Sequence, residues 1–350
     1  MRLHTNAFDL IRLAAAGMVL WSHQHLTDGS GTIGIEVFRT DTGGFGVLIF
    51  FVISGYLNTL SVTRHRAILP FLVSRGLRIY PPLIACVAFS VLVGACFTPD
   101  IRTYFDYRLL SLICKDITLF TGTIAGVSHP VFAGSVLPNT LNGSLWTLPY
   151  ELKMYVVLAV AFATFRFNSA VALAAAVCGL LALGFTALDT FWLQFSALFL
   201  AGSFLAVLQK IANLAVAIFT VLLLCCLFAA VGQHFFAWHL LLVAAVIGLG
   251  SMTLPSWLRP PLDLSYAIYL YAFPVQQVST MVTKNFWIGL SFSITVSSLL
   301  ALLSVLFIEQ PAQRLAPGLR RWLQERSRAM LSKWSVLSPE RIGPPVRPSP

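Results

Sequence analysis

The chain has 350 residues, of which 57% are hydrophobic and 10% are charged, with a mean hydropathy of +0.82 and a formal net charge of +10. A soluble domain carries about 25% charged residues, so this composition excludes an ordinary soluble protein. The positive charge does not indicate a nucleic-acid partner, because Lys and Arg gather on the cytoplasmic loops of membrane proteins.

Apolar runs of about 20 residues recur along the chain, and each is long enough to cross a lipid bilayer. Backbone amides in lipid must be bonded within their own segment, so these runs predict helices. We therefore expect an all-α polytopic membrane protein with about ten transmembrane helices. The predicted spans are roughly 8–27, 44–62, 80–98, 146–165, 169–188, 192–208, 212–231, 237–254, 263–282 and 287–308.

The first predicted span carries ionisable residues in an otherwise apolar helix. Asp9 and Arg12 lie at its entrance, and His23 lies near its far end. In an α-helix, the eleven residues from Arg12 to His23 correspond to about 16 Å, and the two side chains point within about 20° of each other. Ionisable groups in lipid usually face a protein interior or a wet cavity, so this stripe predicts one. We expect Asp9 to pair with Arg12.

The sequence leaves two interpretations of His23 open. It is either a packed or snorkelling residue near the interface, or a general base within the membrane, since a neutral imidazole can remove a proton from a hydroxyl. In the second span, Ser54 and Gly55 lie near mid-membrane. Small residues let helices approach closely, so we interpret this pair first as packing and second as the wall of a channel.

The connection between the second and third spans is basic. Arg75 and Arg78 are three residues apart and would face the same way on a helix. Paired guanidinium forks suit phosphate groups. The alternative is that these arginines only mark a cytoplasmic loop and are satisfied by lipid headgroups.

Glu151 lies just inside the outer end of the fourth span, at about the same depth as His23. Two ionisable groups at one depth on different helices suggest one shared site, and the alternative is a buried Glu paired with Lys153 or an arginine. Before this span, residues 117–137 form a Gly-rich stretch that we interpret as interfacial or re-entrant; if it spans the membrane instead, the count becomes eleven and the topology after it inverts. The cysteines show no metal spacing, so no metal site is predicted.

The charge distribution sets the predicted orientation. With the N-terminus inside, most Lys and Arg fall on cytoplasmic connections and on the tail, which favours both termini inside and an even number of spans. We expect a transmembrane domain over 1–312 and a basic cytoplasmic tail over 313–350, with a short surface helix followed by disorder.

Several stretches resemble, in the same order, those of the membrane-bound acyltransferase-3 family. They are Asp-Leu-Ile-Arg followed after ten residues by His23, Phe-Phe-Val-Ile-Ser-Gly-Tyr-Leu, Arg-Gly-Leu-Arg-Ile-Tyr-Pro, Asn-Gly-Ser-Leu-Trp-Thr-Leu-Pro-Tyr-Glu, Leu-Ser-Tyr-Ala-Ile-Tyr-Leu and Ile-Glu-Gln-Pro. Together they cover residues 9–311. The chain departs from the usual family pattern at Thr147, Pro149, Tyr271 and Ala272.

The resemblance implies an acyltransferase, most specifically an O-acetyltransferase. Family members move acyl groups from cytoplasmic acyl-CoA to sugars of surface polysaccharides, lipopolysaccharide, peptidoglycan or lipo-oligosaccharides. The resemblance implies that acetyl-CoA is the donor substrate and that no cofactor is permanently bound. It implies that the acceptor is a polysaccharide or lipid-linked glycan outside the cytoplasm. It also implies that the protein lies in the bacterial inner membrane. It implies catalytic roles for Arg12, His23 and Glu151, and a role for Arg75 and Arg78 in holding the CoA.

As a hypothesis, the phosphates of acyl-CoA stay near Arg75 and Arg78, and the pantetheine arm passes Arg12 and Ser54 on its way to His23. His23 then activates a sugar hydroxyl, or is itself acylated first, and Glu151 orients or stabilises the imidazole. The sequence leaves open a glycan or lipid transporter or flippase without transfer activity, and a non-catalytic partner of an assembly complex. It does not give the acceptor, the acyl length or the oligomeric state.

Overall fold

The computed structural model describes residues 6–65, 68–119, 127, 130–165, 168, 174 and 190–337. Within these residues the regular secondary structure is helical, apart from one hairpin of two short strands. Five helical segments are long and apolar enough to cross a membrane, namely Thr42–Arg64, Ile68–Cys96, Leu145–Thr164, Phe191–Ala212 and Phe286–Leu323, and two shorter apolar helices join them. The prediction of a polytopic, helical membrane protein is confirmed.

Nine predicted spans correspond to helices in the described part of the chain. They are α1 (Phe8–Asp28), α2 (Thr42–His65), α3 (Ile68–Cys96), α6 (Leu148–Thr164), α8 (Thr190–Ala212), α9 (Leu214–Ala230), α10 (His234–Gly250), α11 (Ser265–Val282) and α12 (Phe286–Ser304). The predicted span at 169–188 lies outside the described residues except for Ala174.

Helix α3 begins well before the predicted start of the third span. It runs from Ile68 to Cys96 with Pro81 and Pro82 inside it. Proline is best tolerated in the first turn of a helix, yet both prolines lie well inside this one. One continuous helix carries both Arg75 and Arg78 on its N-terminal turns, so these residues belong to a helix and not to a loop.

The remaining elements lie between and after the long helices. They are β1 (Gly34–Ile35), which pairs antiparallel with β2 (Thr40–Asp41), η1 (Glu36–Phe38), α4 (Ile101–Tyr104), α5 (Tyr107–Thr118), η2 (Leu145–Thr147), η3 (Ser256–Leu258), a π-helix (Val305–Glu309) and α13 (Gln310–Leu337). In the stretch 117–137, α5 ends at Thr118, and the described residues 130–137 contain no helix.

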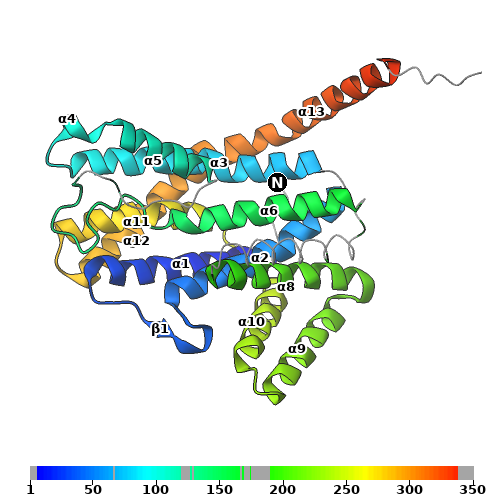
Figure 1. The fold of residues 1–350 in the computed structure, drawn as a ribbon. Helices are drawn as coiled ribbons and strands as arrows, with labels where there is room; N and C mark the ends of the chain where they lie inside the picture. The colour runs from blue at the N-terminus through cyan, green and yellow to red at the C-terminus, as the bar shows by residue number, and fades with distance from the viewer. Residues whose placement is uncertain are drawn as a thin grey trace, which may run out of the picture.

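Figure 1 shows α1, α3, α6 and α11 running along a common direction, α12 rising obliquely toward α13, and α4 and α5 at one end of the bundle. The α9–α10 hairpin projects to one side, and α13 extends beyond the opposite end. The predicted tail therefore begins with a helix, and its last residues, 338–350, lie outside the described part.

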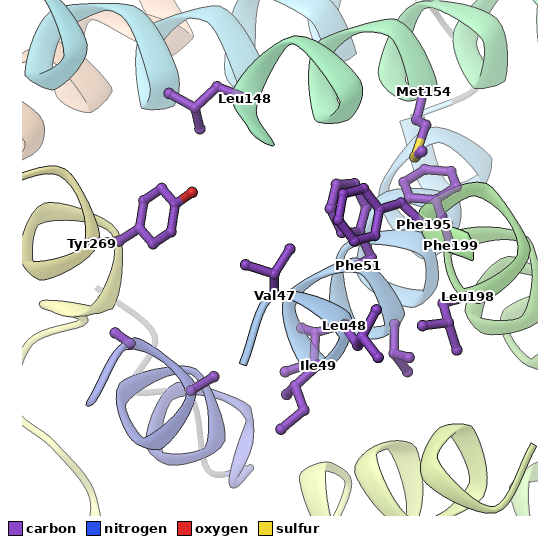
Figure 2. Packing of buried hydrophobic residues seen from close by; sticks show 14 of the residues in the cluster. Val47, Leu48, Ile49, Phe51, Leu148, Met154, Phe195, Leu198, Phe199 and Tyr269 are labelled. Atoms are coloured by element: carbon purple, nitrogen blue, oxygen red, sulfur yellow. The ribbon is translucent and has the colours of Figure 1, made fainter. Parts of the chain in front are cut away.

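Helices α2 and α8 approach each other through glycine. A Cβ added at Gly55 would lie 1.8 Å from the carbonyl oxygen of Phe199, and one added at Gly202 would lie 2.3 Å from that of Val52. Beside this contact, Phe51 stacks on Phe195 with ring centroids 4.4 Å apart (Figure 2). Close backbone approach through small residues is the usual way that membrane helices pack, so the packing interpretation of Gly55 is confirmed.

Buried polar side chains of α1, α11 and α12 bond to one another at the end of the bundle near α5. The Oγ of Ser293 donates to Oε1 of Gln24 at 2.9 Å, and the amide of Gln276 donates to the Leu20 carbonyl at 2.6 Å. Hydrogen bonding between helices offsets the cost of polar groups in an apolar surrounding. This network fixes α1 against α11, the helix that also meets Arg12 and His23.

Candidate active site

One carboxylate joins three helices at the end of the bundle from which α13 extends. Asp263, just before α11, accepts hydrogen bonds from Nη1 of Arg12 on α1 and from Nη2 of Arg78 on α3, the latter at 2.8 Å. Its other oxygen accepts from the Ser265 hydroxyl at 2.5 Å. Arg12 also pairs with Asp9 at 3.1 Å, so that prediction is confirmed. Charge pairing of this kind lets arginines stay inside a membrane protein.

A cavity of about 580 Å³ opens beside these arginines. Helices α1, α2, α3, α6 and α11 all contribute to its wall, which is mostly apolar around Val47, Phe50 and Leu148. Five of the six predicted site residues line this cavity: Arg12, Ser54, Arg75, Arg78 and Glu151. Convergent polar groups in an otherwise apolar cavity are typical of a small-molecule site.

Glu151 is held by hydroxyl groups on the wall of the cavity. It accepts hydrogen bonds from the Ser54 hydroxyl at 2.8 Å and from the Tyr155 hydroxyl, and Ser54 receives a further bond from the Asn58 amide at 3.1 Å. Lys153, considered as its partner, lies instead over the ring of Trp192 at 5.8 Å. Glu151 thus presents a hydrogen-bonded carboxylate to the cavity.

His23 lies outside the lining of this cavity. Its Nδ1 is 3.4 Å from the Ser144 hydroxyl, and its ring stands edge-on to Phe273 of α11 at 5.3 Å. Gly143 makes this packing possible, since a Cβ there would lie 2.6 Å from the Phe273 ring. Because Ser144 contacts Nδ1, the other ring nitrogen of His23, Nε2, is the one available to a reacting group.

The expected contact between His23 and Glu151 is absent among the interactions of the described residues. Glu151 bonds to Ser54 and Tyr155, whereas His23 meets Ser144 and Phe273. Equal depth along two helices does not fix the direction in which their side chains point, which is why the sequence argument failed here. By contrast, the predicted common face of Arg12 and His23 is confirmed, because both side chains meet residues of α11 or its entrance.

Two hydroxyls connect the cavity to Ser144, the residue whose side chain contacts His23. Tyr269 and Thr147 line the cavity and bond to each other at 2.5 Å, and the Tyr269 hydroxyl donates to the carbonyl oxygen of Ser144. Figure 2 shows Tyr269 projecting from α11 toward the space beside Leu148 and Val47. His23 therefore lies outside the cavity, and Ser144 lies between it and the cavity residue Tyr269.

Several of these residues carried weak or no signal in the sequence. Tyr266 and Tyr269 of α11 line the cavity. Asp263 opened that span, yet its bonds to two arginines far away in sequence were not foreseen. Ser144 carried no predicted role. The described residues contain no group of three His, Cys, Asp or Glu side chains able to hold a metal ion.

Comparison with known proteins gives consistent matches over most of the chain. The sequence model of the acyltransferase domain of the acyltransferase-3 family matches residues 5–308. An "O-acetyl transferase" of Shigella phage Sf6 is 29% identical over 291 residues, which cover 78% of this chain and 85% of the relative. "Nodulation protein 10" of Rhizobium leguminosarum bv. viciae is 31% identical over 359 aligned positions, covering 90% of this chain and 95% of the relative. No solved structure matches significantly.

Proposed function

Because this chain belongs to the acyltransferase-3 family, we propose that it is a membrane O-acetyltransferase that moves an acetyl group from cytoplasmic acetyl-CoA to a hydroxyl of a glycan on the other side of the membrane. The observation that carries the proposal is the cavity, which has arginines at one end and the Tyr269–Thr147 pair in its wall. Tyr269 bonds to Ser144, whose hydroxyl contacts His23.

The donor enters from the end at which Arg75 and Arg78 line the cavity. Guanidinium groups bind phosphate oxygens well, so the phosphates of acetyl-CoA stay there. The slender pantetheine arm follows the apolar wall past Arg12 and Ser54 toward Tyr269. Acetyl-CoA acts as a substrate, so no permanently bound cofactor is needed.

His23 supplies the chemistry just beyond the Tyr269–Thr147 wall of the cavity, and that wall has to open for the thioester to reach it. Its free Nε2 removes the proton of a sugar hydroxyl as the oxygen attacks the thioester carbonyl, and the imidazolium then returns that proton to the departing CoA thiolate. In an alternative route, Nε2 of His23 attacks the thioester and releases the CoA thiolate; the sugar oxygen then takes the acetyl group from the imidazole, and the hydroxyl proton passes to the thiolate. In both routes Ser144 holds the ring and the Glu151 carboxylate favours the imidazolium charge from the cavity side, whereas Arg12, about 16 Å from His23 along α1, lines the path of the pantetheine arm.

The acceptor is the hydroxyl of a polysaccharide or lipid-linked glycan that approaches the end of the bundle near His23. The match to an "O-acetyl transferase" supports an O-linked product. Both termini and the arginines then lie on the cytoplasmic side of a bacterial inner membrane, as the charge distribution favours. Residues 1–312 form the transferase domain, and 313–350 form a basic cytoplasmic tail.

The test uses protein purified in detergent, labelled acetyl-CoA, and bacterial surface polysaccharides from which alkali has removed existing O-acetyl groups. The proposal predicts alkali-labile label on one of these glycans. Changing both Arg75 and Arg78 to Ala should chiefly raise the KM for acetyl-CoA. If label never reaches sugar while the purified protein carries glycan or lipid across a vesicle membrane, the protein is a transporter and the proposal fails.

A further inference from the structure

A second, smaller pocket lies between α3 and the tail helix α13. Its volume is about 210 Å³, and its lining includes Ser74, Arg75 and Arg78 from α3 and Gln313 and Arg320 from α13. Three of its seven lining residues are arginines, and none carries a carboxylate. Arg75 and Arg78 also line the main cavity, so the two spaces share a wall.

Two of the three arginines have buried donors that the described residues leave unused. The Nε atoms of Arg75 and Arg320 are shielded from solvent and have no hydrogen-bond partner in the described part of the chain. Nearly all buried polar atoms in native structures are paired, so such atoms call for an acceptor. Arg78 differs, because Asp263 already accepts from its Nη2 at 2.8 Å. Asp263 thus anchors Arg78, and the free donors come from Arg75 and Arg320.

We propose that this pocket binds a phosphate group, with Arg75 and Arg320 as its principal ligands and with Arg78, Ser74 and Gln313 around it. Guanidinium groups meet phosphate oxygens through charge-assisted hydrogen bonds, and three positive side chains suit a group that carries up to two negative charges. Arg320 is the new element, because it lies beyond the residues 5–308 that the family model matches.

The inference rests on the proposed function for the source of the phosphate, which is the nucleotide end of the CoA donor. The shared wall at Arg75 and Arg78 places the pocket beside the mouth of the main cavity, so a donor bound here directs its pantetheine arm inward. A phospholipid headgroup offers the same chemistry from a second source, and the experiment has to separate the two.

The variant Arg320→Gln removes the charge, and Arg321→Gln is its matched control, since Arg321 is the next residue on the same helix and is exposed. Binding of CoA and of pantetheine, which has no phosphate, is measured by titration calorimetry on full-length protein in nanodiscs of phosphatidylcholine. We expect Arg320→Gln to weaken CoA binding about tenfold, to leave pantetheine binding unchanged, and Arg321→Gln to change neither. Arg320→Lys, which keeps the charge without the fork, should fall between wild type and Arg320→Gln.

Equal CoA affinity in Arg320→Gln and Arg321→Gln would overturn the inference, as would an equal loss of pantetheine binding. A second arm adds phosphatidylglycerol to the nanodiscs. If Arg320→Gln changes only the amount of that lipid retained by the protein, with CoA binding intact, the pocket is a lipid site and the inference is wrong. A chain that binds CoA through Arg320 yet never acetylates a glycan would instead refute the proposed function alone.

Discussion

Asp263 is the acid on which two arginines of the site depend. It contacts Arg12 and Arg78 while its side chain is only 19% exposed. Since α1, α3 and α11 come together at this carboxylate, it acts as a cross-link as well as a counter-charge. The two arginines of α3 therefore differ: Asp263 anchors Arg78, whereas Arg75 keeps a free hydrogen-bond donor.

Replacing Asp263 with Asn should destabilise the protein by about 2–3 kcal/mol, less than the 3–5 kcal/mol typical of a fully buried pair. The physical reason is that two guanidinium groups then face each other without their shared acid. Thermal unfolding of purified protein measures the effect, with Glu325→Gln, an exposed change on α13, as control. An unchanged unfolding temperature would show that Asp263 does not hold the helices together.

Ser144 should act on the reaction through His23. Ser144→Ala removes the hydroxyl 3.4 Å from Nδ1, so the ring loses a group that holds its orientation. We expect kcat to fall about tenfold, as for the loss of one hydrogen bond of about 1.4 kcal/mol, with the KM for acetyl-CoA unchanged. Steady-state kinetics on Ser144→Ala and on exposed Ser256→Ala provide the comparison. A rise in KM with constant kcat would point to donor binding instead.

At the scale of elements, the contact between α2 and α8 sets the position of Ser54. Gly55 packs directly on the backbone of α8, and its neighbour Ser54 faces the cavity. A shift of α2 therefore moves the hydroxyl that bonds to Glu151.

Gly55→Ala and Gly17→Ala form a matched pair on two membrane helices. The new methyl group at residue 55 meets a carbonyl oxygen at 1.8 Å, whereas residue 17 has nothing within 4 Å. We expect Gly55→Ala to lower the unfolding temperature and the activity, since the backbone of α8 cannot move away without disturbing the packing of the two helices. Gly17→Ala should be neutral or stabilising by up to about 1 kcal/mol, because alanine favours a helix. Equal behaviour of the two variants would contradict this packing.

Helix α5 carries an acid whose burial makes stability depend on pH. Burial raises the pKa of Asp116 to about 7, and its Oδ1 has no partner among the described residues. An unfolded Asp titrates near pH 3.9, so between about pH 4 and 7 the folded protein keeps a proton that the unfolded chain releases. Stability should therefore fall as pH rises through this window, and the loss should be complete above it.

Asp116→Asn removes that titration. The variant should unfold at a higher temperature than wild type at about pH 8, and the difference should vanish at about pH 4. Unfolding temperatures across the pH range give the comparison, with Asp28→Asn at the end of α1 as control. A wild-type curve with the same slope as that of Asp116→Asn would contradict the assignment.

At the scale of the whole molecule, the sequence predicted what depends on local pattern. The lengths of the apolar runs predicted the spans that correspond to α1, α2 and α12. Helical geometry predicted the common face of Arg12 and His23. The predicted third span began at residue 80, whereas α3 begins at Ile68 and continues through Pro81 and Pro82.

The arrangement of the site depended on contacts between distant segments, which no local pattern specifies. Glu151 and His23 lie at similar depths but are turned toward different partners. The bonds from Asp263 to Arg12 and Arg78, and from Tyr269 to Ser144, join residues more than a hundred positions apart. The rotation of each helix about its axis decides such pairs, and that rotation follows from packing of the complete bundle.

In the proposed reaction, an acetyl group passes from a donor on the arginine-lined side of the membrane to a glycan on the His23 side. The most direct measurement is transfer in proteoliposomes with labelled acetyl-CoA on one side only and de-O-acetylated polysaccharide on the other. The account predicts labelled glycan when the donor faces Arg75 and Arg78, and no labelled glycan with folded His23→Ala protein. Undiminished transfer by His23→Ala, or transfer only when both substrates share one side, would contradict it.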